Sequence, residues 1–98
     1  MILLKVKVLK IEYLAQFCIL TGKQEENFIT KANNLGELIE ELDIKYPLFK
    51  KYSLDDATNN LNDQIRVVIA KEGSLAADAM SLGNRNAIIE HGMCITFW

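Results

Sequence analysis

Hydrophobic and polar positions alternate most clearly near the start of the chain. Residues 4–8 alternate leucine or valine with lysine, and residues 9–13 alternate apolar with charged residues on the opposite parity. A period of two is typical of a β-strand with one solvent-facing side. Because the parity changes between these two segments, we expect a bulge or bend there. The β-prone segment 27–30 follows a turn at residues 21–23, so it is expected to pair back as a hairpin.

A second pattern, with apolar residues three and four positions apart, predicts one helix. Its apolar stripe consists of Leu35, Leu38, Ile39, Leu42 and Tyr46. Asn34 is a favourable N-cap, and Glu37 follows three residues later, as in a capping box. Pro47 disfavours helical geometry at the residue before it, so the helix is expected to end at Tyr46.

The second half of the chain contains two more strand patterns. Residues 65–70 are mostly apolar on both parities, which is typical of a central strand. Residues 94–98 are expected to form the last strand, after a turn at residues 90–92.

Three other segments give weaker signals. Residues 15–20 are apolar without a clear period, and residues 74–82 are alanine-rich, which predicts a short helix. Residues 48–63 are polar and are expected to form a loop. The side chains expected to anchor this loop to the core are Tyr52, Leu54 and Leu61.

The element order is strand, strand, helix, long loop, strand, loop, strand. Strands separated by a helix need a crossover, which favours parallel pairing in part of the sheet. We therefore expect one domain over residues 1–98 with an α+β fold, a mixed sheet with one main helix on one face. This is the order of the β-grasp, or ubiquitin-like, roll, and the pattern leaves other α+β rolls open.

Composition narrows the function classes. The chain has 11 Lys and Arg against 13 Asp and Glu, a net charge of −2, which argues against nucleic-acid binding. No run approaches the about 20 apolar residues that span a bilayer, and lysines interrupt the apolar start before a signal peptide forms. Cys18 and Cys94 lie far apart in the sequence. We expect two reduced thiols, which are typical of a cytoplasmic protein, and the alternative is one disulfide.

Catalytic and metal-binding patterns are weak in this sequence. His91 and Cys94 are close in the chain, but no third group is evident to orient them, so a turn histidine and a buried thiol are expected. The acidic pair Glu25 and Glu26 and the acids of the helix are interpreted as solvated. No phosphate-binding, nucleophile-elbow or zinc spacing occurs. The sequence therefore predicts a protein that is not an enzyme, with no catalytic residues, metal site or cofactor.

The alternation of the last strand bears on binding. If Ile95 and Phe97 point inward, then Cys94, Thr96 and Trp98 point outward. An outward Trp98 is a natural interface anchor. The alternative is that Trp98 folds over the sheet edge and closes the core.

Three stretches together resemble the MoaD/ThiS family, which includes the small subunit of molybdopterin synthase and the thiamin-pathway sulfur carrier. Residues 10–22 are similar to the family's first strand, its alanine-containing bend and the glycine before the second strand. Residues 34–47 resemble its helix, which typically ends in a Tyr-Pro pair. Residues 89–97 resemble its last turn and strand, although His91 and Met93 replace the acids that flank the turn glycine.

The resemblance implies a sulfur-carrier-like protein of molybdenum cofactor biosynthesis. Family carriers end in Gly-Gly, which an E1-like enzyme adenylates before sulfur is added, so a carrier role requires such a tail after Trp98. The implied partners are an E1-like activating enzyme and a large synthase subunit, and the matching apolar interface positions are Leu14 and Trp98. The alternative is a β-grasp interaction module without sulfur chemistry. A third class is a thiol enzyme that uses Cys94 and His91.

Overall fold

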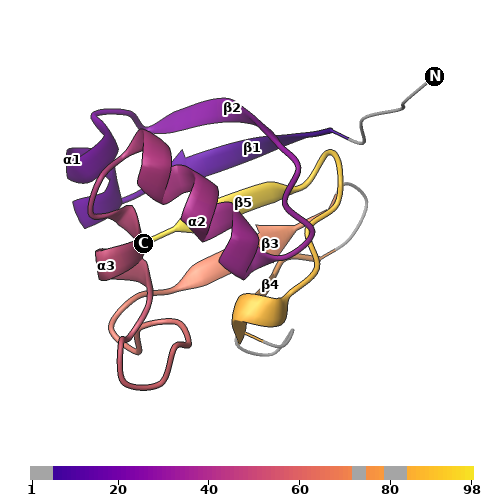
Figure 1. Cartoon of the computed structure of the whole chain (residues 1–98). Helices are drawn as coiled ribbons and strands as arrows, with labels where there is room; N and C mark the ends of the chain where they lie inside the picture. The colour runs from indigo at the N-terminus through magenta and orange to yellow at the C-terminus, as the bar shows by residue number, and fades with distance from the viewer. Residues whose placement is uncertain (1–5, 72–74, 79–83) are drawn as a thin grey trace.

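The computed structural model describes residues 6–71, 75–78 and 84–98, which form a five-stranded mixed sheet with a long helix across one face (Figure 1). The elements in chain order are β1 (Lys7–Tyr13), α1 (Gln16–Thr21), β2 (Glu25–Thr30), α2 (Leu35–Lys45), α3 (Phe49–Ser53), β3 (Val67–Ala70), β4 (Ala77–Asp78), a 3-10 helix (Asn84–Asn86) and β5 (Cys94–Phe97).

The strand order in the sheet is β2-β1-β5-β3-β4. β5 lies in the middle, parallel to β1 and antiparallel to β3, as the yellow strand in Figure 1 shows. β2 pairs antiparallel with β1, so the expected hairpin is confirmed. β3 has a strand on each side, which agrees with the central position expected for residues 65–70.

The expected bulge in the first strand is wrong. Pairing with β2 runs without interruption from Lys7 opposite Thr30 to Glu12 opposite Glu25. Leu9 is fully buried, whereas Val8 is exposed on the other face. The change of apolar parity therefore reflects a regular strand that carries valines on its solvent side. Residues 4 and 5 lie outside the described part of the chain.

The predicted helix is confirmed as α2, and its ends follow from local chemistry. The Asn34 side chain accepts a hydrogen bond from the Glu37 backbone N–H at 2.9 Å. The Glu37 carboxylate accepts in turn from the backbone N–H of Asn33, one residue before the expected partner, at 2.8 Å. Tyr46 is the C-cap, and Pro47 follows it. The helix therefore begins and ends where its caps place it.

The segment 48–63 is not a continuous loop, because α3 lies within it. Leu54 and Leu61 are buried as expected, but Tyr52 is 44% exposed. The main anchor is Phe49, which is fully buried. An aromatic residue two positions after Pro47 thus fixes this segment to the core.

Two other expectations change. Residues 77 and 78 form strand β4 beside β3 and not a helix, while residues 74 and 79–82 lie outside the described part of the chain. The segment 15–20 largely forms the short helix α1, which ends at Thr21 and is capped by Gly22 with φ 73°. A positive φ at little steric cost explains glycine at that turn.

The core lies between the sheet and α2. One face of each inner strand and the apolar stripe of α2 supply most of it. Its fully buried side chains of large volume are Leu9, Ile11, Tyr13, Phe17, Leu35, Leu38, Ile39, Leu42, Phe49, Ile89, Ile95 and Phe97. At one end Phe97 packs edge-on against Phe49, with ring centroids 5.0 Å apart.

Candidate docking surface

The open face of the sheet, opposite α2, carries alternate side chains of its inner strands. In β1 they include Lys10 and Glu12, and in β5 they are Cys94 and Thr96. The parallel register places Lys10 beside Cys94 and Glu12 beside Thr96. Ile95 on the same strand is fully buried, so the inward and outward sets are separated as the alternation predicts.

Leu14 and Trp98 lie side by side where β1 and β5 end. Both strands run in the same direction, so their carboxyl ends meet at one edge of the sheet. The Leu14 backbone N–H donates to the Phe97 carbonyl at 2.9 Å. The two side chains are 43% and 47% exposed, respectively. Trp98 is thus on the surface, and the placement in which it closes the core is excluded.

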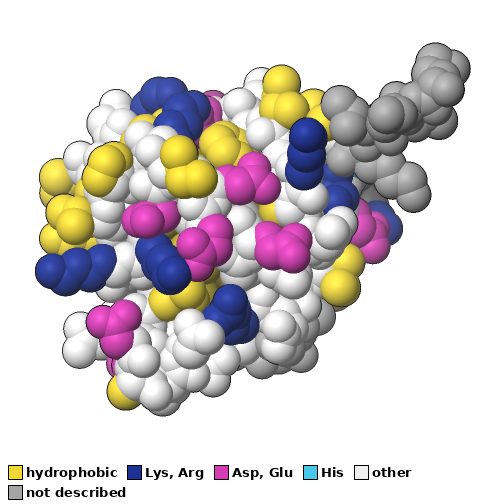
Figure 2. Space-filling view, viewed as in Figure 1, with side chains coloured by type: hydrophobic (Ala, Val, Ile, Leu, Met, Phe, Trp, Pro, Cys, Tyr) yellow, Lys and Arg dark blue, Asp and Glu magenta, His cyan; other side chains and the backbone are white. Residues whose placement is uncertain are grey.

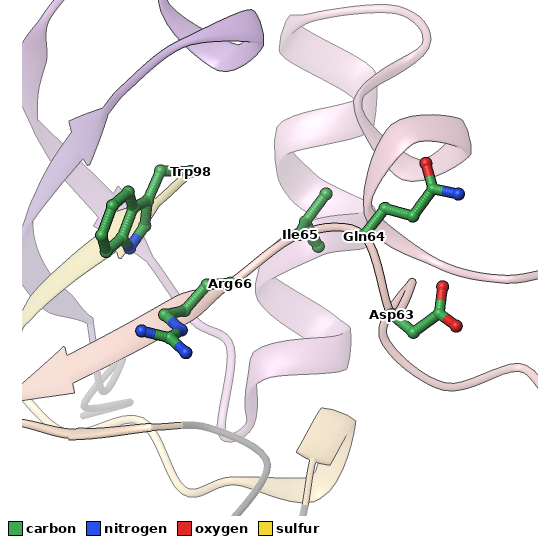
Figure 3. Close-up of a pocket in the computed structure, with 5 residues that line it drawn as sticks. All are labelled: Asp63, Gln64, Ile65, Arg66 and Trp98. Carbon is green, nitrogen blue, oxygen red and sulfur yellow. The ribbon is translucent and has the colours of Figure 1, made fainter.

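Trp98 is held in place by the neighbouring strand. Its backbone exchanges two hydrogen bonds with Arg66, at 2.6 and 2.9 Å. The Arg66 guanidinium lies over the indole, 5.8 Å from the ring centroid. Both side chains line a hollow of about 360 Å³. Figure 3 shows them with the other lining residues, Asp63, Gln64 and Ile65. The indole is therefore presented on a fixed backbone, as an interface anchor requires.

Glu12 lies on the open face, near the end of β1. One of its oxygens, Oε1, accepts hydrogen bonds from Cys94 Sγ at 3.2 Å and from Thr96 Oγ1 at 3.0 Å. These two bonds lower the pKa of Glu12, so the carboxylate is charged at neutral pH. Lys10, the adjacent cation on the strand, forms an ion pair with Glu25 at 3.1 Å.

Cys94 and His91 form hydrogen bonds with different groups. His91 Nδ1 accepts from the Val8 backbone N–H at 3.0 Å, while the Cys94 thiol donates to Glu12. Burial, and then the Glu12 carboxylate, raise the pKa of the Cys94 thiol. A reactive cysteine needs the opposite shift, because the thiolate is the nucleophile. This geometry does not favour the thiol-enzyme hypothesis.

The cysteines and acidic residues suggest no other chemistry. Cys18 and Cys94 are both free thiols, so the two reduced cysteines expected from the sequence are present. Within residues 6–71, 75–78 and 84–98, no group of three potential ligands is placed to hold a metal. In the same ranges, no helix has the length and apolarity needed to cross a membrane.

Glu26 corrects the interpretation of the acidic pair as solvated. Its side chain, on the α2 side of the sheet, is only 8% exposed. It accepts hydrogen bonds from the hydroxyls of Tyr13 and Tyr46, each at 2.6 Å. It also pairs with Lys45 at 2.7 Å and Lys23 at 3.2 Å. Glu26 therefore joins β1, β2 and α2, and its parity, the same as that of Phe28 and Thr30, is the sequence signal for this position.

Figure 2 shows the helix-covered side of the molecule, where acidic and basic side chains alternate over the middle. Hydrophobic side chains gather toward the edge that α1 and α3 occupy. The residues that contribute exposed apolar side chains from this region are Ile19, Ile44, Leu48 and Tyr52. They provide matched comparisons for the apolar pair on the open face.

No protein-family model matches the chain, and no curated protein matches it. Solved structures do match. Small archaeal modifier protein 1 from Methanosarcina acetivorans shares 16% identity at TM-score 0.71, over 95% of this chain and 92% of that one. Urm1 from Trypanosoma brucei shares 17% at TM-score 0.67, over 94% and 90%. The putative molybdopterin converting factor subunit 1 from Pyrococcus furiosus shares 21% at TM-score 0.61, over 93% and 94%.

The fold is the ubiquitin-like β-grasp. The predicted α+β class, with a mixed sheet and one main helix on one face, is confirmed. At these identities the likeness establishes the fold alone. Within this β-grasp, the assignment of Leu14 and Trp98 to an interface stays a prediction, because no partner chain is present. Sequence reasoning missed Glu12 and Arg66, which set the charge around that pair.

Proposed function

We propose that this β-grasp chain is a carrier or subunit that acts by docking on a protein partner through the open face of its sheet. The observation that carries the proposal is the apolar pair Leu14 and Trp98, half-exposed where two parallel central strands end. Large apolar and aromatic side chains held on rigid backbone are typical energetic centres of interfaces. In this role the chain is a protein substrate or subunit and not itself an enzyme.

The resemblance to MoaD/ThiS proteins supplies the partner class, an E1-like activating enzyme, a large synthase subunit, or both. A carrier offers its terminal carboxylate to the activating enzyme. Because Trp98 directly follows β5, docking of the Leu14 and Trp98 pair would bring any residues that follow it against the partner. We propose sulfur transfer for molybdenum cofactor biosynthesis as the pathway and the cytoplasm as the compartment. This chemistry requires a Gly-Gly end after Trp98.

The docking surface is tested by calorimetric titration of the natural protein with the E1-like enzyme of the same organism. Leu14→Ala and Trp98→Ala are each expected to weaken the complex about tenfold or more, because truncated interface anchors cost about 2 kcal/mol. Ile44→Ala on α2 removes a similarly apolar, 84% exposed side chain and is expected to change nothing. Equal affinities for all four proteins would contradict docking through the open face.

The alternative, an interaction module without sulfur chemistry, is favoured by one observation. The apolar pair belongs to the folded sheet, so docking needs no tail. Incubation with the activating enzyme, ATP and a sulfur donor, followed by intact mass measurement, separates the two roles. A carrier exchanges one carboxylate oxygen for sulfur, whereas a module forms the complex with its mass unchanged.

A further inference from the structure

The negative charge of Glu12 on the open face is only partly compensated by the side chains around it. Among the described residues, Oε1 of Glu12 carries both hydrogen bonds, from Cys94 and Thr96, and Oε2 has no partner. The charge of Lys10 attracts Glu12 and helps to lower its pKa, but the Lys10 ammonium group is paired with Glu25, on the far side of β1 from β5. The two donors fix the Glu12 side chain, so its second oxygen is presented as an oriented acceptor.

The position of Glu12 gives this acceptor a consequence for docking. Glu12 comes two residues before Leu14, and Thr96 comes two residues before Trp98, so the four side chains form adjoining rows on one face. A partner that covers Leu14 and Trp98 also removes water from Glu12. Desolvation of a carboxylate is strongly unfavourable unless a cation binds it directly, and Lys10, on the same face, is paired with Glu25. A stable complex therefore needs a cation opposite Glu12.

The same surface has room for a long side chain. A hollow of about 540 Å³ lies where β1 ends and α1 begins, and its lining includes Glu12, Glu25, Leu14, Ala15 and Cys18. None of the described residues that line it is a lysine or arginine. An aliphatic stem fits the apolar part of this lining, and a terminal positive charge fits the two carboxylates.

We propose that the docking partner inserts an arginine or lysine side chain into this hollow, with its cationic group on Oε2 of Glu12 and an apolar neighbour against Leu14 and Trp98. The inference rests on the proposed docking function and names the chemistry that the partner must bring. Glu12 acts as a residue that determines specificity, because a partner with an acidic or apolar side chain at this point leaves a desolvated charge unpaired.

The test uses small probes, so it does not depend on any particular enzyme. The isotope-labelled protein is titrated with N-acetyl-leucyl-arginine amide and, separately, with the citrulline analogue, which has the same shape without the charge. Backbone amide shifts are followed by NMR. The arginine probe is expected to shift the signals of Glu12, Leu14 and Thr96 and to bind about five- to tenfold more tightly than the citrulline probe.

Two variants locate the effect. Glu12→Gln retains an oxygen for Cys94 and Thr96 and is expected to remove the preference for arginine. Glu40→Gln neutralises an exposed carboxylate on α2, outside the hollow, which Lys50 already pairs, and is expected to retain the preference. Equal binding of the two probes, or a preference that survives Glu12→Gln, would overturn the inference. Because no enzyme is used, that outcome is distinct from a failure of the activating enzyme to bind.

Discussion

Two carboxylates on neighbouring strands, one on each face of the sheet, show how differently the two faces are built. Glu26, on the α2 side, is surrounded by two tyrosine hydroxyls and two lysines. Glu12, on the open side, uses one oxygen for two donors. The saturated carboxylate ties elements of the fold together, whereas the half-saturated one retains binding capacity. The carboxylate that α2 covers thus contributes to stability, whereas the one on the open face belongs to the surface that we propose for docking.

The same contrast separates two adjacent residues at the end of β5. Phe97 is fully buried in a cluster with Phe17 and Phe49, whose ring centroids lie 5.5 and 5.0 Å away. Trp98, the next residue, is 47% exposed and contacts Arg66. The larger of the two aromatic side chains, Trp98, therefore lies on the open face and contributes little to the packed core.

The largest expected effect separates these two neighbours. Phe97→Ala is expected to lower the free energy of unfolding by about 4 kcal/mol, because it leaves a cavity among packed rings. Trp98→Ala is expected to lower it by less than about 1 kcal/mol. Chemical denaturation measures both. A loss for Trp98→Ala as large as that for Phe97→Ala would contradict the surface position of Trp98.

The next largest effect is a loss of stability at acidic pH, which tests the role of the buried Glu26 carboxylate. Burial alone would raise the pKa of Glu26, but the hydrogen bonds from Lys45, Tyr13, Tyr46 and Lys23 outweigh it and lower the pKa to about 2, from 4.5. A carboxyl group with a lowered pKa in the folded state stabilises that state at every pH above the pKa of the unfolded chain. This stabilisation is lost as the pH falls toward the pKa of the folded state. The expected loss between these limits is about 3 kcal/mol.

Denaturant unfolding across this pH window measures that loss. Glu26→Gln is expected to be less stable at neutral pH and to show a shallower decline in acid, since the titrating group is gone. Glu12→Gln, on the open face, is the control and is expected to retain most of the decline. An unchanged acid slope in Glu26→Gln would contradict the role of this carboxylate.

The smallest expected effect concerns Ala15, in the bend between β1 and α1. Ala15 has φ 52° and ψ −126°, a conformation that suits glycine. Ala15→Gly is expected to raise the free energy of unfolding by about 0.5–1 kcal/mol, because relief of strain exceeds the entropy cost of glycine. Ala57→Gly, at an exposed position without positive φ, is the control and is expected to lower it slightly. Destabilisation by both substitutions would show that Ala15 is unstrained.

Locally determined elements were predictable from the sequence. The helix α2 has its cap, its apolar stripe and its Tyr-Pro stop within the segment 34–47, and the turn at residues 90–92 contains Gly92 with φ 84°. Strand alternation also predicted that Trp98 points away from Phe97. These signals act over a few residues, so one sequence contains them in full.

The errors arose where distant parts of the chain decide the outcome. Residues 77 and 78 sit in an alanine-rich stretch that favours helix, yet pairing with β3 makes them a strand. The helices α1 and α3 have only six and five residues, too few for a periodic pattern. The sequence favours a solvated Glu26, because its four donors come from three separate segments. The strand parity of Glu26 indicates the face on which it lies, but no local pattern reports that these donors converge on it.

The central position of β5 has a consequence for how the molecule is made. β1 and β3 each pair with β5, so neither gains this partner until residues 94–97 are available. A chain emerging from the ribosome can form the β1–β2 hairpin and α2 early, because these contacts are close in sequence. Until the last strand arrives, the edges of β1 and β3 stay open to incorrect pairing. We therefore expect the two halves of the sheet to join only after residues 94–97 have left the ribosome.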